Sequence, residues 1–509
     1  MPDTIGRLVR EQATRHGSKP MVVDPASRLS YRELDSSTTE LAASFVDAGV
    51  GKGTRVGLIM PNGVRWVQMA IALGRLGAVL VPLSTLLKAG ELVAQLRAAS
   101  VQFLLSVEEF RGHRYLDDVR ALPRTELPAL RETWTADQLA RAAAGDTARR
   151  VVDAVADTVS PADPLAIMFT SGSGGAPKGV QHSHHSALGA VRSGLAARCI
   201  TAETRLYLPM PFFWVGGFGG GILSALCAGA TLVTEGIPRP EGTLRLLETE
   251  RVTLFRGWPD QAEALARHAA AVGADLSSLR PGSLQALLPP EQRAARGARA
   301  TLFGMTEAFG PYCGFPADTD MPMEAWGSCG KPFVGMEVRI AGPEGGVPVA
   351  PGKAGEIQIR GPHTLRGICG RSREDVFTVD GFYPTGDVGH LDENGFLFYH
   401  GRSDDMFKVS GATVYPGEVE RALRSIAGVE NAFVTNVPGA AGQRVGAAVV
   451  CREPLDVGQL TSSARELLSS FKIPTLWLLL DSDDDVPRGG TGKVDVLRLR
   501  EMLVAAGRS

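Results

Sequence analysis

The sequence predicts an α/β protein with a large N-terminal domain of layered helices and strands, a β-rich subdomain within it, and a small α+β domain at the C-terminus. In the first half, short apolar runs alternate with longer stretches of helical periodicity, an order typical of parallel strands covered by helices. From about residue 335, short strand-like runs are separated by Gly and Pro turns, which indicates a β-rich region. A chain of 509 residues also exceeds the ~250–300 residues that one hydrophobic core usually holds.

The elements of the large domain follow in order along the chain. Arg55–Met60 is strand-like, Val64–Gly77 has helical periodicity, and Ala78–Leu83 is strand-like again. Residues 120–150 are rich in Ala, Arg and Leu without turn signals, and we expect a solvated helix or loop there. Further on, MEVRIAG, GEIQIRG and GFLFYHG predict the short strands of the β-rich subdomain.

The last hundred residues predict a compact α+β unit. GEVERALRSI and LTSSARELLSS have helical periodicity, whereas NAFVTNV and RVGAAVVC are strand-like. We place the boundary at Arg402–Asp404, so the expected domains are residues 1–402 and 403–509.

Composition and charge restrict the classes of function. A net charge of −2 provides no basic field for nucleic acid or an anionic membrane surface. No apolar run reaches the ~18 residues that a spanning helix needs, and the N-terminus lacks the apolar core of a signal peptide. The six cysteines are scattered without CxxC spacing, which is typical of a reducing cytosol. We therefore expect a cytoplasmic protein without an integral membrane segment.

A glycine-rich segment follows the strand-like run Leu165–Phe169. Residues Thr170–Gly179 read TSGSGGAPKG. Glycines let a phosphate approach the backbone, whose free N–H groups form an anion cradle, and the hydroxyls and the lysine add donors and a charge. Pro177 before Lys178 and Gly179 after it exclude a P-loop, which needs Gly-Lys followed by Ser or Thr.

A flexible Gly-Ser linker is the alternative for this segment. A linker rarely ends in Pro-Lys-Gly after a buried strand, so phosphate binding is favoured. The residues that we expect to bind nucleotide here are Thr170, Ser171, Gly172, Ser173, Gly174, Gly175 and Lys178.

Five stretches occur in an order that resembles the adenylate-forming enzymes, which include acyl-CoA synthetases, luciferases and the adenylation domains of peptide synthetases. They are TSGSGGAPKG, FGMTE (Phe303–Glu307), YPTGDVGHLDENGFLFYHGR (Tyr383–Arg402), KVSGATVYPGEVE (Lys408–Glu420) and PRGGTGKV (Pro487–Val494). The resemblance covers the whole chain and is strongest to stand-alone actinobacterial acyl-CoA ligases. It implies activation of a hydrophobic carboxylic acid through an acyl-AMP intermediate and transfer to the thiol of CoA, with ATP, Mg²⁺ and CoA taking part.

The resemblance assigns roles to the FGMTE motif. Glu307 would help hold Mg²⁺, which commonly takes one or two carboxylates plus phosphate oxygens. A charge at a helix N-terminus is the alternative for this residue. Thr306 would touch the α-phosphate, and Phe303 and Gly304 would contact the nucleotide.

Roles also follow for the second half of the chain. Asp387 should accept hydrogen bonds from both ribose hydroxyls, a plain turn aspartate being the alternative, and Arg402 resembles the second contact to ribose and phosphate. Lys493 would be the catalytic lysine, a cation able to reach the carboxylate and the α-phosphate together.

In the family the small domain is mobile and rotates after adenylation. Asp404 matches the hinge, and Lys408 and Gly411 match the path of the CoA pantetheine arm, where a glycine lets the thiol arm pass close to the backbone. The run His182–His185 could suggest metal ligands, but it lacks acidic or Cys partners nearby, and His184 matches a family position beside the phosphate loop.

The sequence departs from the family pattern at three places. Gly174 replaces a hydroxyl of the phosphate loop, and Trp214 stands where many relatives carry histidine. Leu284 and Gln285 replace a glycine pair, although the adjoining Ala286, expected at the nucleotide, is retained. The two added side chains could crowd ATP or tilt the carboxylate.

Other functions therefore remain open. The chain could be a partial enzyme that only thioesterifies a preformed acyl adenylate supplied by a second ligase. It could also be a non-catalytic relative that binds AMP esters, although retention of Glu307 and Lys493 speaks against this. An adenylating enzyme for an oxyacid other than a carboxylate is also conceivable.

The acyl pocket is expected around FFWVGGFGGGILSAL. Its aromatic side chains would form apolar walls and its glycines would leave volume, although helix packing could also explain those glycines. A bulky hydrophobic acid, fatty or polycyclic, would fit. The expected acyl-binding residues are Phe213, Trp214, Phe218, Leu284 and Gln285.

Overall fold

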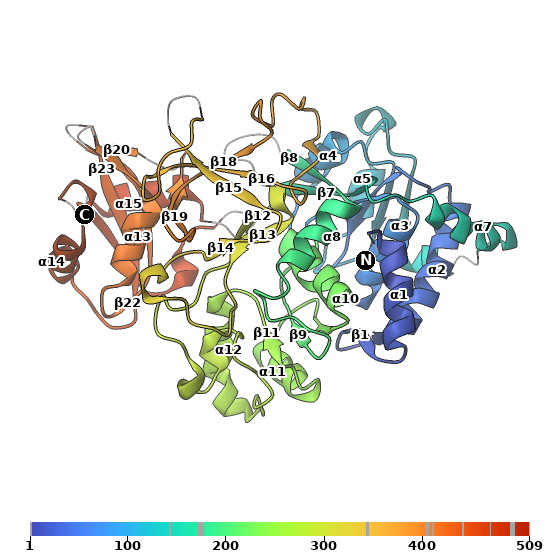
Figure 1. Ribbon diagram of the computed structural model, residues 1–509, viewed down its shortest axis with the longest axis horizontal. Coiled ribbons are helices and arrows are strands. Elements are labelled where there is room, and N and C mark those ends of the chain that lie inside the picture. Colours follow the sequence, from blue (N-terminus) through green and yellow to red (C-terminus); the bar gives the residue numbers. More distant parts are fainter. Residues whose placement is uncertain are drawn as a thin grey trace. The chain divides into compact units, whose positions relative to one another are not determined.

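In the computed structural model the chain forms two compact units (Figure 1). The first consists of Met1–Glu337 and Ile359–Tyr383, and the second of Val338–Gln358 and Pro384–Ser509. Within this division the strands of the β-rich subdomain group with the last hundred residues. The boundary expected between residues 402 and 403 is a different one and stays a prediction. The described residues are 3–141, 144–170, 178–342, 346–403, 407–409, 412–439, 442–468, 470–488 and 494–507.

The first unit contains a seven-stranded sheet in the order β17-β8-β7-β4-β3-β5-β6. Strands β7, β4, β3, β5 and β6 run parallel; at one edge β8 is antiparallel to β7, and β17 is antiparallel to β8. The bounds are β3 Arg55–Ile59, β4 Val79–Pro82, β5 Phe103–Ser106, β6 Glu132–Thr135, β7 Pro164–Thr170, β8 Lys178–Ser183 and β17 Gly367–Ile368.

Helices cover both faces of this sheet. Val56, Leu58 and Leu80 point to the face packed by α2 and α3, whereas the alternate residues Ile59 and Val81 pack against α4 and α5. The layered α/β prediction is therefore confirmed. The helices are α1 Ile5–His16, α2 Tyr31–Asp47, α3 Val64–Arg75, α4 Ala89–Ala98 and α5 Tyr115–Arg120.

The segment 120–150 differs from the expectation of a solvated helix or loop. Helices α6 (Ala136–Arg141) and α7 (Asp146–Asp157) are present, but β6 joins the sheet edge beside β5. None of the four residues of β6 is buried, so the strand lacks the apolar pattern by which strands are recognised.

A second, five-stranded sheet of the first unit has the order β11-β9-β10-β1-β2, and a three-stranded sheet has the order β12-β13-β14. Figure 1 shows α11 and α12 beside β9 and β11. The strands are β1 Pro20–Val23, β2 Arg28–Ser30, β9 Arg205–Tyr207, β10 Thr231–Val233, β11 Leu254–Phe255, β12 Phe303–Met305, β13 Gly310–Gly314 and β14 Lys331–Pro332. The helices are α8 His184–Ser193, α9 Val215–Gly217, α10 Ser224–Ala228, α11 Pro240–Thr249 and α12 Pro259–Val272.

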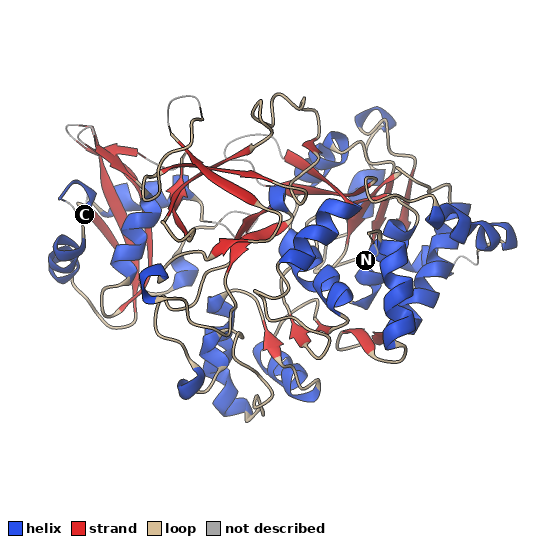
Figure 2. Ribbon diagram, in the orientation of Figure 1, coloured by secondary structure: helices blue, strands red, loops and turns tan. Residues whose placement is uncertain are grey.

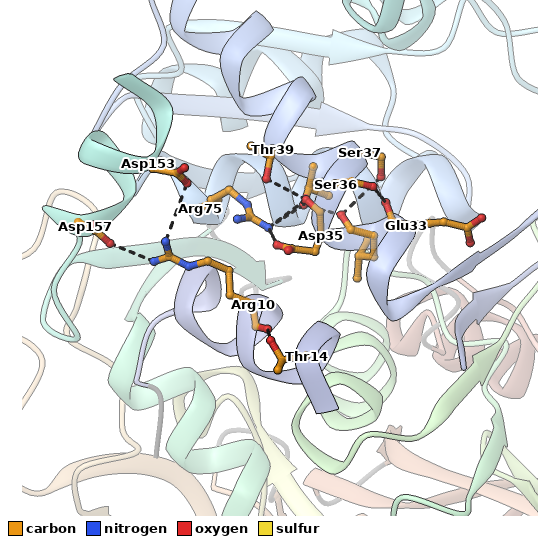
Figure 3. A network of polar contacts seen from close by, with 12 residues as sticks. Arg10, Thr14, Glu33, Asp35, Ser36, Ser37, Thr39, Arg75, Asp153 and Asp157 are labelled. Atoms are coloured by element: carbon orange, nitrogen blue, oxygen red, sulfur yellow. Dashed lines mark hydrogen bonds and ion pairs between the residues drawn. The ribbon is translucent and has the colours of Figure 1, made fainter. Parts of the chain in front are cut away.

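Polar contacts tie the N-terminal helices together (Figure 3). The guanidinium of Arg75 in α3 is 1% exposed, pairs with the Asp35 carboxylate in α2 and donates to Thr38 Oγ1 at 3.2 Å. Arg10 in α1 pairs with Asp157 in α7 at 3.0 Å. Removal of the partner of such a buried charge strongly destabilises the fold.

The second unit combines a four-stranded sheet, order β15-β16-β18-β19, with the two-stranded sheet β20-β21 and the three-stranded sheet β22-β23-β24. Figure 2 shows its α13, α14 and α15 as helices beside these strands. The expected helices and strands of the last hundred residues are present. The bounds are β15 Glu337–Ala341, β16 Gly355–Arg360, β18 Tyr383–Leu391, β19 Leu397–Arg402, β20 Phe407–Val409, β21 Ala412–Val414, α13 Pro416–Arg424, β22 Val429–Gly439, β23 Gly442–Cys451, α14 Val457–Leu467, β24 Leu476–Leu480 and α15 Val496–Ala506.

Candidate active site

The two flanks of the glycine-rich segment are paired strands. Thr170 is the last residue of β7 and Lys178 the first of β8, and they face one another in the antiparallel register. Both are half-buried. Ser171, Gly172, Ser173, Gly174 and Gly175 lie outside the described residues, so their nucleotide-binding role stays a prediction.

The FGMTE motif forms a strand followed by a tight turn. Phe303–Met305 is β12, and Thr306–Ala308 is a single 3₁₀ turn. Gly304 approaches β13 so closely that a Cβ there would lie 2.1 Å from the carbonyl oxygen of Gly310. The glycine of the motif is therefore required by packing of the β12–β13 hairpin, which places Thr306 and Glu307 at its tip.

Hydrogen bonds from uncharged donors hold the turn. The carbonyl oxygen of Thr306 accepts from His182 Nε2 at 2.7 Å and from the Phe309 N–H at 2.9 Å. Glu307 is 6% exposed, its Oε1 accepts from the Tyr383 hydroxyl at 3.1 Å, and its carbonyl oxygen accepts from the Leu365 N–H at 2.7 Å. These partners come from β8, from the start of β18 and from the segment before β17.

The turn leaves two polar groups without an internal partner. Among the described residues, the Thr306 hydroxyl and Glu307 Oε2 make no hydrogen bond. Carboxylate oxygen is the ligand type that Mg²⁺ prefers, and a hydroxyl can donate to a phosphate oxygen. The arrangement therefore fits a magnesium-bound phosphate group.

The two buried histidines of the His182–His185 run have different partners. Burial lowers the pKa of His182 and the pKa of His184 to about 4, so both are neutral at pH 7. His184 Nδ1 accepts from the Ile5 N–H at 3.2 Å, next to α1. It is His182 that contacts the FGMTE motif, and no sequence motif distinguishes it from its neighbours in the run. In the part of the chain that the structure describes, no three His, Cys, Asp or Glu side chains are placed to hold a metal.

In the second unit, Asp387 and Arg402 face one another across β18 and β19. Arg402 Nη1 lies 3.2 Å from Asp387 Oδ1 and donates to the Thr385 carbonyl oxygen at 2.7 Å. Gly386 has a φ of 72°, and a Cβ there would lie 2.8 Å from Arg402 Nη2. Asp387 thus lies within β18 rather than in a turn, and its role at the ribose stays a prediction.

The aromatic side chains of the expected acyl pocket fall into two groups. The rings of Phe212 and Phe218 are buried against Trp66, at 5.3 Å and 5.7 Å between ring centroids. Trp214 is half-buried, and its ring lies edge-on to Phe213 at 5.5 Å and to Trp258 at 5.7 Å. Trp214 and Trp258 are therefore the more accessible pair, and Trp258 is 36% exposed.

The glycines of this segment pack closely. A Cβ on Gly217 would lie 2.1 Å from the Pro211 carbonyl oxygen, and a Cβ on Gly221 would lie 2.8 Å from Leu208 Cδ2. The expectation that these glycines leave volume for the acid is therefore wrong at these two positions, because backbone and core side chains already occupy the space. The alternative, helix packing, accounts for them.

The segment that replaces the family glycine pair lies beside α12. Leu284 is half-buried and packs against a cluster that includes Phe255 and Leu265, and Ala286 packs against the same cluster. Gln285 is exposed at the start of a 3₁₀ turn, Gln285–Leu287. Part of the Leu284 side chain is thus used in the core.

The predicted catalytic and CoA-binding residues of the small domain are only partly described. Lys408 lies in β20, where its backbone pairs opposite Thr413. Its side chain is outside the described residues, as are Gly411, the hinge residue Asp404 and Lys493. Arg488 and Val494 flank the Lys493 segment and form an antiparallel bridge.

Comparison with known proteins identifies the family. Residues 9–369 match the protein family described as AMP-binding enzyme. The chain belongs to this family. It is an AMP-forming acyl-CoA synthetase of the adenylate-forming superfamily, the class of its curated relatives.

Three similar proteins illustrate the relationship. The 3-(7a-methyl-1,5-dioxo-octahydro-1H-inden-4-yl)propanoyl:CoA ligase of Mycobacterium tuberculosis is 33% identical over 527 residues, covering 99% of this chain and 98% of that protein. The feruloyl-CoA synthase of Amycolatopsis sp is 32% identical over 496 residues, covering 95% of this chain and 94% of that protein. The O-succinylbenzoate CoA synthetase of Bacillus subtilis, solved with ATP and a magnesium ion, has a TM-score of 0.77 at 24% identity and covers 98% and 99% of the two chains. This last likeness shows the fold.

Proposed function

We propose that the protein joins a hydrophobic carboxylic acid to CoA in two steps at the expense of ATP. In the first, a carboxylate oxygen attacks the α-phosphorus of ATP, the bond to pyrophosphate breaks, and acyl-AMP forms. In the second, the sulfur of CoA attacks the acyl carbon, the bond to AMP breaks, and the thiol proton is lost to solvent or buffer. The observation that carries the proposal is the Thr306–Glu307 turn, whose hydroxyl and second carboxylate oxygen have no hydrogen-bond partner among the described residues.

The residues of the turn have separate tasks in the first step. The Thr306 hydroxyl would donate to an oxygen of the α-phosphate, and Glu307 Oε2 would bind Mg²⁺ while Tyr383 holds the other carboxylate oxygen. The bound ion would neutralise phosphate charge. Because the turn is held by hydrogen bonds within the protein, little reorganisation would accompany charge development at the α-phosphorus.

The remaining contacts to ATP come from three places. The segment from Thr170 to Lys178 would cradle the phosphates, and Phe303, Gly304 and Ala286 would contact the base. In the second unit, Asp387 would accept the two ribose hydroxyls, and Arg402 would orient that carboxylate through its ion pair.

The small domain would supply the mobile groups. Lys493 would approach the carboxylate and the α-phosphate during adenylation, and rotation about Asp404 would then bring Lys408 and Gly411 beside the pantetheine arm of CoA. A cytoplasmic location is proposed because the substrates ATP and CoA are present there, and because all six cysteines are free thiols.

We further propose that the acid carries a ring system. Trp214 and Trp258 offer an accessible edge-on aromatic pair beside Phe213, suited to flat or polycyclic groups. The names of the two curated relatives above refer to a bicyclic propanoyl group and to a feruloyl group. A fatty acid is the alternative, and another relative, 28% identical, is named a long-chain-fatty-acid CoA ligase.

The decisive experiment separates the two half-reactions. ATP–pyrophosphate exchange is measured with a panel of ring-containing and fatty acids, beside thioester formation from synthetic acyl adenylates and CoA. We expect both activities in the wild type, loss of exchange in Lys493→Ala, and thioester formation from supplied adenylate nearly intact in that variant, because the lysine acts only in the first transition state.

The other outcomes identify the alternatives. Thioester formation without pyrophosphate exchange for any acid would indicate the partial enzyme that depends on a second ligase for its adenylate. Adenylate binding without either half-reaction would indicate a non-catalytic relative. Equal loss of both steps in Lys493→Ala would mean that its role is structural.

A further inference from the structure

We infer that His182 is a positioning residue for adenylation. Its hydrogen bond to the Thr306 backbone sets the location of Thr306 and Glu307. The inference rests on the proposed function, since it concerns the step in which Thr306 and Glu307 act. His182 lies four residues beyond Lys178 on β8, and its side chain is fully buried.

The hydrogen bonds define a single state of the ring. A carbonyl oxygen can only accept, so the proton lies on Nε2, which donates to Thr306 at 2.7 Å. Nδ1 is then the acceptor and lies 3.4 Å from the Ser186 hydroxyl. Burial lowers the pKa of His182 to about 4, and the ring therefore keeps this neutral form throughout the physiological pH range.

The bond from His182 to Thr306 joins β8 to the turn, two segments far apart in the sequence. The other donor to the Thr306 carbonyl is the N–H of Phe309, three residues away in the same turn. That bond keeps the turn closed but does not fix where the turn lies. The His182 bond spans 124 residues and fixes the turn against β8, the strand that leaves the phosphate-binding segment.

The turn is also restrained on its other side. The ring of Phe309 lies edge-on to the His182 ring, with 4.9 Å between centroids, and Phe309 adopts a left-handed φ of 54°. A change in the His182 ring would therefore act on the turn through two contacts, one polar and one apolar. The α-phosphate contact and the metal-binding carboxylate would move together.

Burying a histidine has a desolvation cost that an apolar residue avoids. A leucine could fill much of this volume within β8 without that cost. What the leucine lacks is the Nε2–H donor, so the specific contribution of histidine at position 182 is the position of the turn.

The test uses two amides that differ in reach. The side-chain nitrogen of Gln occupies nearly the place of His Nε2. The Asn side chain is shorter, and its nitrogen lies near the place of Nδ1. We expect His182→Asn and His182→Leu to lower kcat for ATP–pyrophosphate exchange by about 10–100-fold, since a misplacement of ~1 Å can cost 10²-fold. We expect His182→Gln to retain kcat within about threefold, and the KM for ATP to change by less than about threefold in all three.

The matched control is Tyr31→Phe. Tyr31 is buried elsewhere in the first unit, and its hydroxyl donates to the carbonyl oxygens of Ala225 at 3.0 Å and Ala230 at 2.7 Å. This variant also loses a buried polar contact, so it should lower the free energy of unfolding without lowering kcat. Unfolding by denaturant is measured for every variant.

Two results would overturn the inference while leaving the proposed function intact. One is a wild-type kcat in a folded His182→Asn, and the other is an equal fall in kcat for His182→Gln and His182→Asn. If His182→Leu fails to fold, the Gln and Asn pair decides. Absence of pyrophosphate exchange in the wild type with every acid would instead overturn adenylation itself.

Discussion

The Thr306–Glu307 turn of the first unit and the Asp387–Arg402 pair of the second are held in place by different forces. The turn is fixed by neutral groups, the imidazole of His182 and the phenol of Tyr383, both of which are buried. Asp387 is fixed by an ion pair, in which the arginine side chain remains 36% exposed.

This difference matches two different tasks. Buried hydrogen bonds from neutral donors are directional and little screened by salt, which suits groups that must lie at a set distance from the reacting phosphorus. A partly exposed ion pair orients a carboxylate for a ligand but is screened by salt and contributes little to stability. We therefore expect changes at the turn to act on kcat and changes at the pair to act on the KM for ATP.

The largest effect is expected at Glu307. Glu307→Gln keeps an acceptor for Tyr383 but removes the charge that would bind Mg²⁺. We expect kcat for pyrophosphate exchange to fall by about 10²–10³-fold, the range found when a group that stabilises transition-state charge is removed. The measurement is exchange at saturating ATP over a titration of Mg²⁺.

Tyr383→Phe is the matched variant at this carboxylate. It leaves the charge and removes only the orienting hydroxyl, so a smaller loss of about tenfold is expected. If the two variants lose activity equally, orientation rather than charge is the contribution of Glu307.

A smaller effect is expected at Asp387. In Asp387→Asn a charged acceptor for the ribose hydroxyls is lost, and we expect the KM for ATP to rise by about 10–150-fold with kcat changed little, in line with ~1.5–3 kcal/mol for a hydrogen bond to a charged group. The wild type should discriminate against 2′-deoxy-ATP, and the variant should discriminate less. A fall in kcat at unchanged KM would contradict the division of tasks between the two regions.

Two histidines with lowered pKa values, one in each unit, predict a fall in stability in acid. Burial lowers the pKa of His182 in the first unit and the pKa of His400 in the second to about 4, and for His400 the neighbouring His390 and Arg421 add to the effect. The unfolded chain takes up these protons below about pH 6.5 while the folded chain does not, so their contribution to stability is full above that pH and is lost toward pH 4.

The fully buried His182 should therefore lower the free energy of unfolding by up to about 2 kcal/mol between pH 7 and pH 5, and the half-buried His400 should lower it by less. His182→Gln and His400→Gln should each reduce this pH dependence, as measured by denaturant unfolding at a series of pH values. A pH dependence unchanged in either variant would mean that the pKa of the corresponding ring is the same in the folded and the unfolded chain.

The smallest effect is expected at the segment that replaces the glycine pair. Leu284→Gly removes a half-buried side chain from the cluster beside α12 and adds a flexible residue, so we expect a loss of about 1–2 kcal/mol in the free energy of unfolding. Gln285→Gly changes an exposed side chain and should cost less than ~1 kcal/mol. Pyrophosphate exchange raised tenfold in either variant would show that the side chain obstructs ATP.

Local patterns predicted most of the fold and several of the candidate residues. The strand at 55–60, the helix at 64–77 and the α+β texture of the last hundred residues could be read because each has its own periodicity. Strand β6 was missed because none of its residues is buried, and the glycines at 217 and 221 were misread because the neighbours that crowd them come from other segments.

The sequence alone predicts which residues would supply charge and hydroxyl groups, because Thr306, Glu307, Asp387 and Arg402 lie in contiguous motifs whose chemistry is local. Only the tertiary structure decided what holds them. The bond from His182 to Thr306 spans 124 residues and that from Tyr383 to Glu307 spans 76. Such partners depend on strand register and on how separate elements pack, and short-range periodicity carries no information about either.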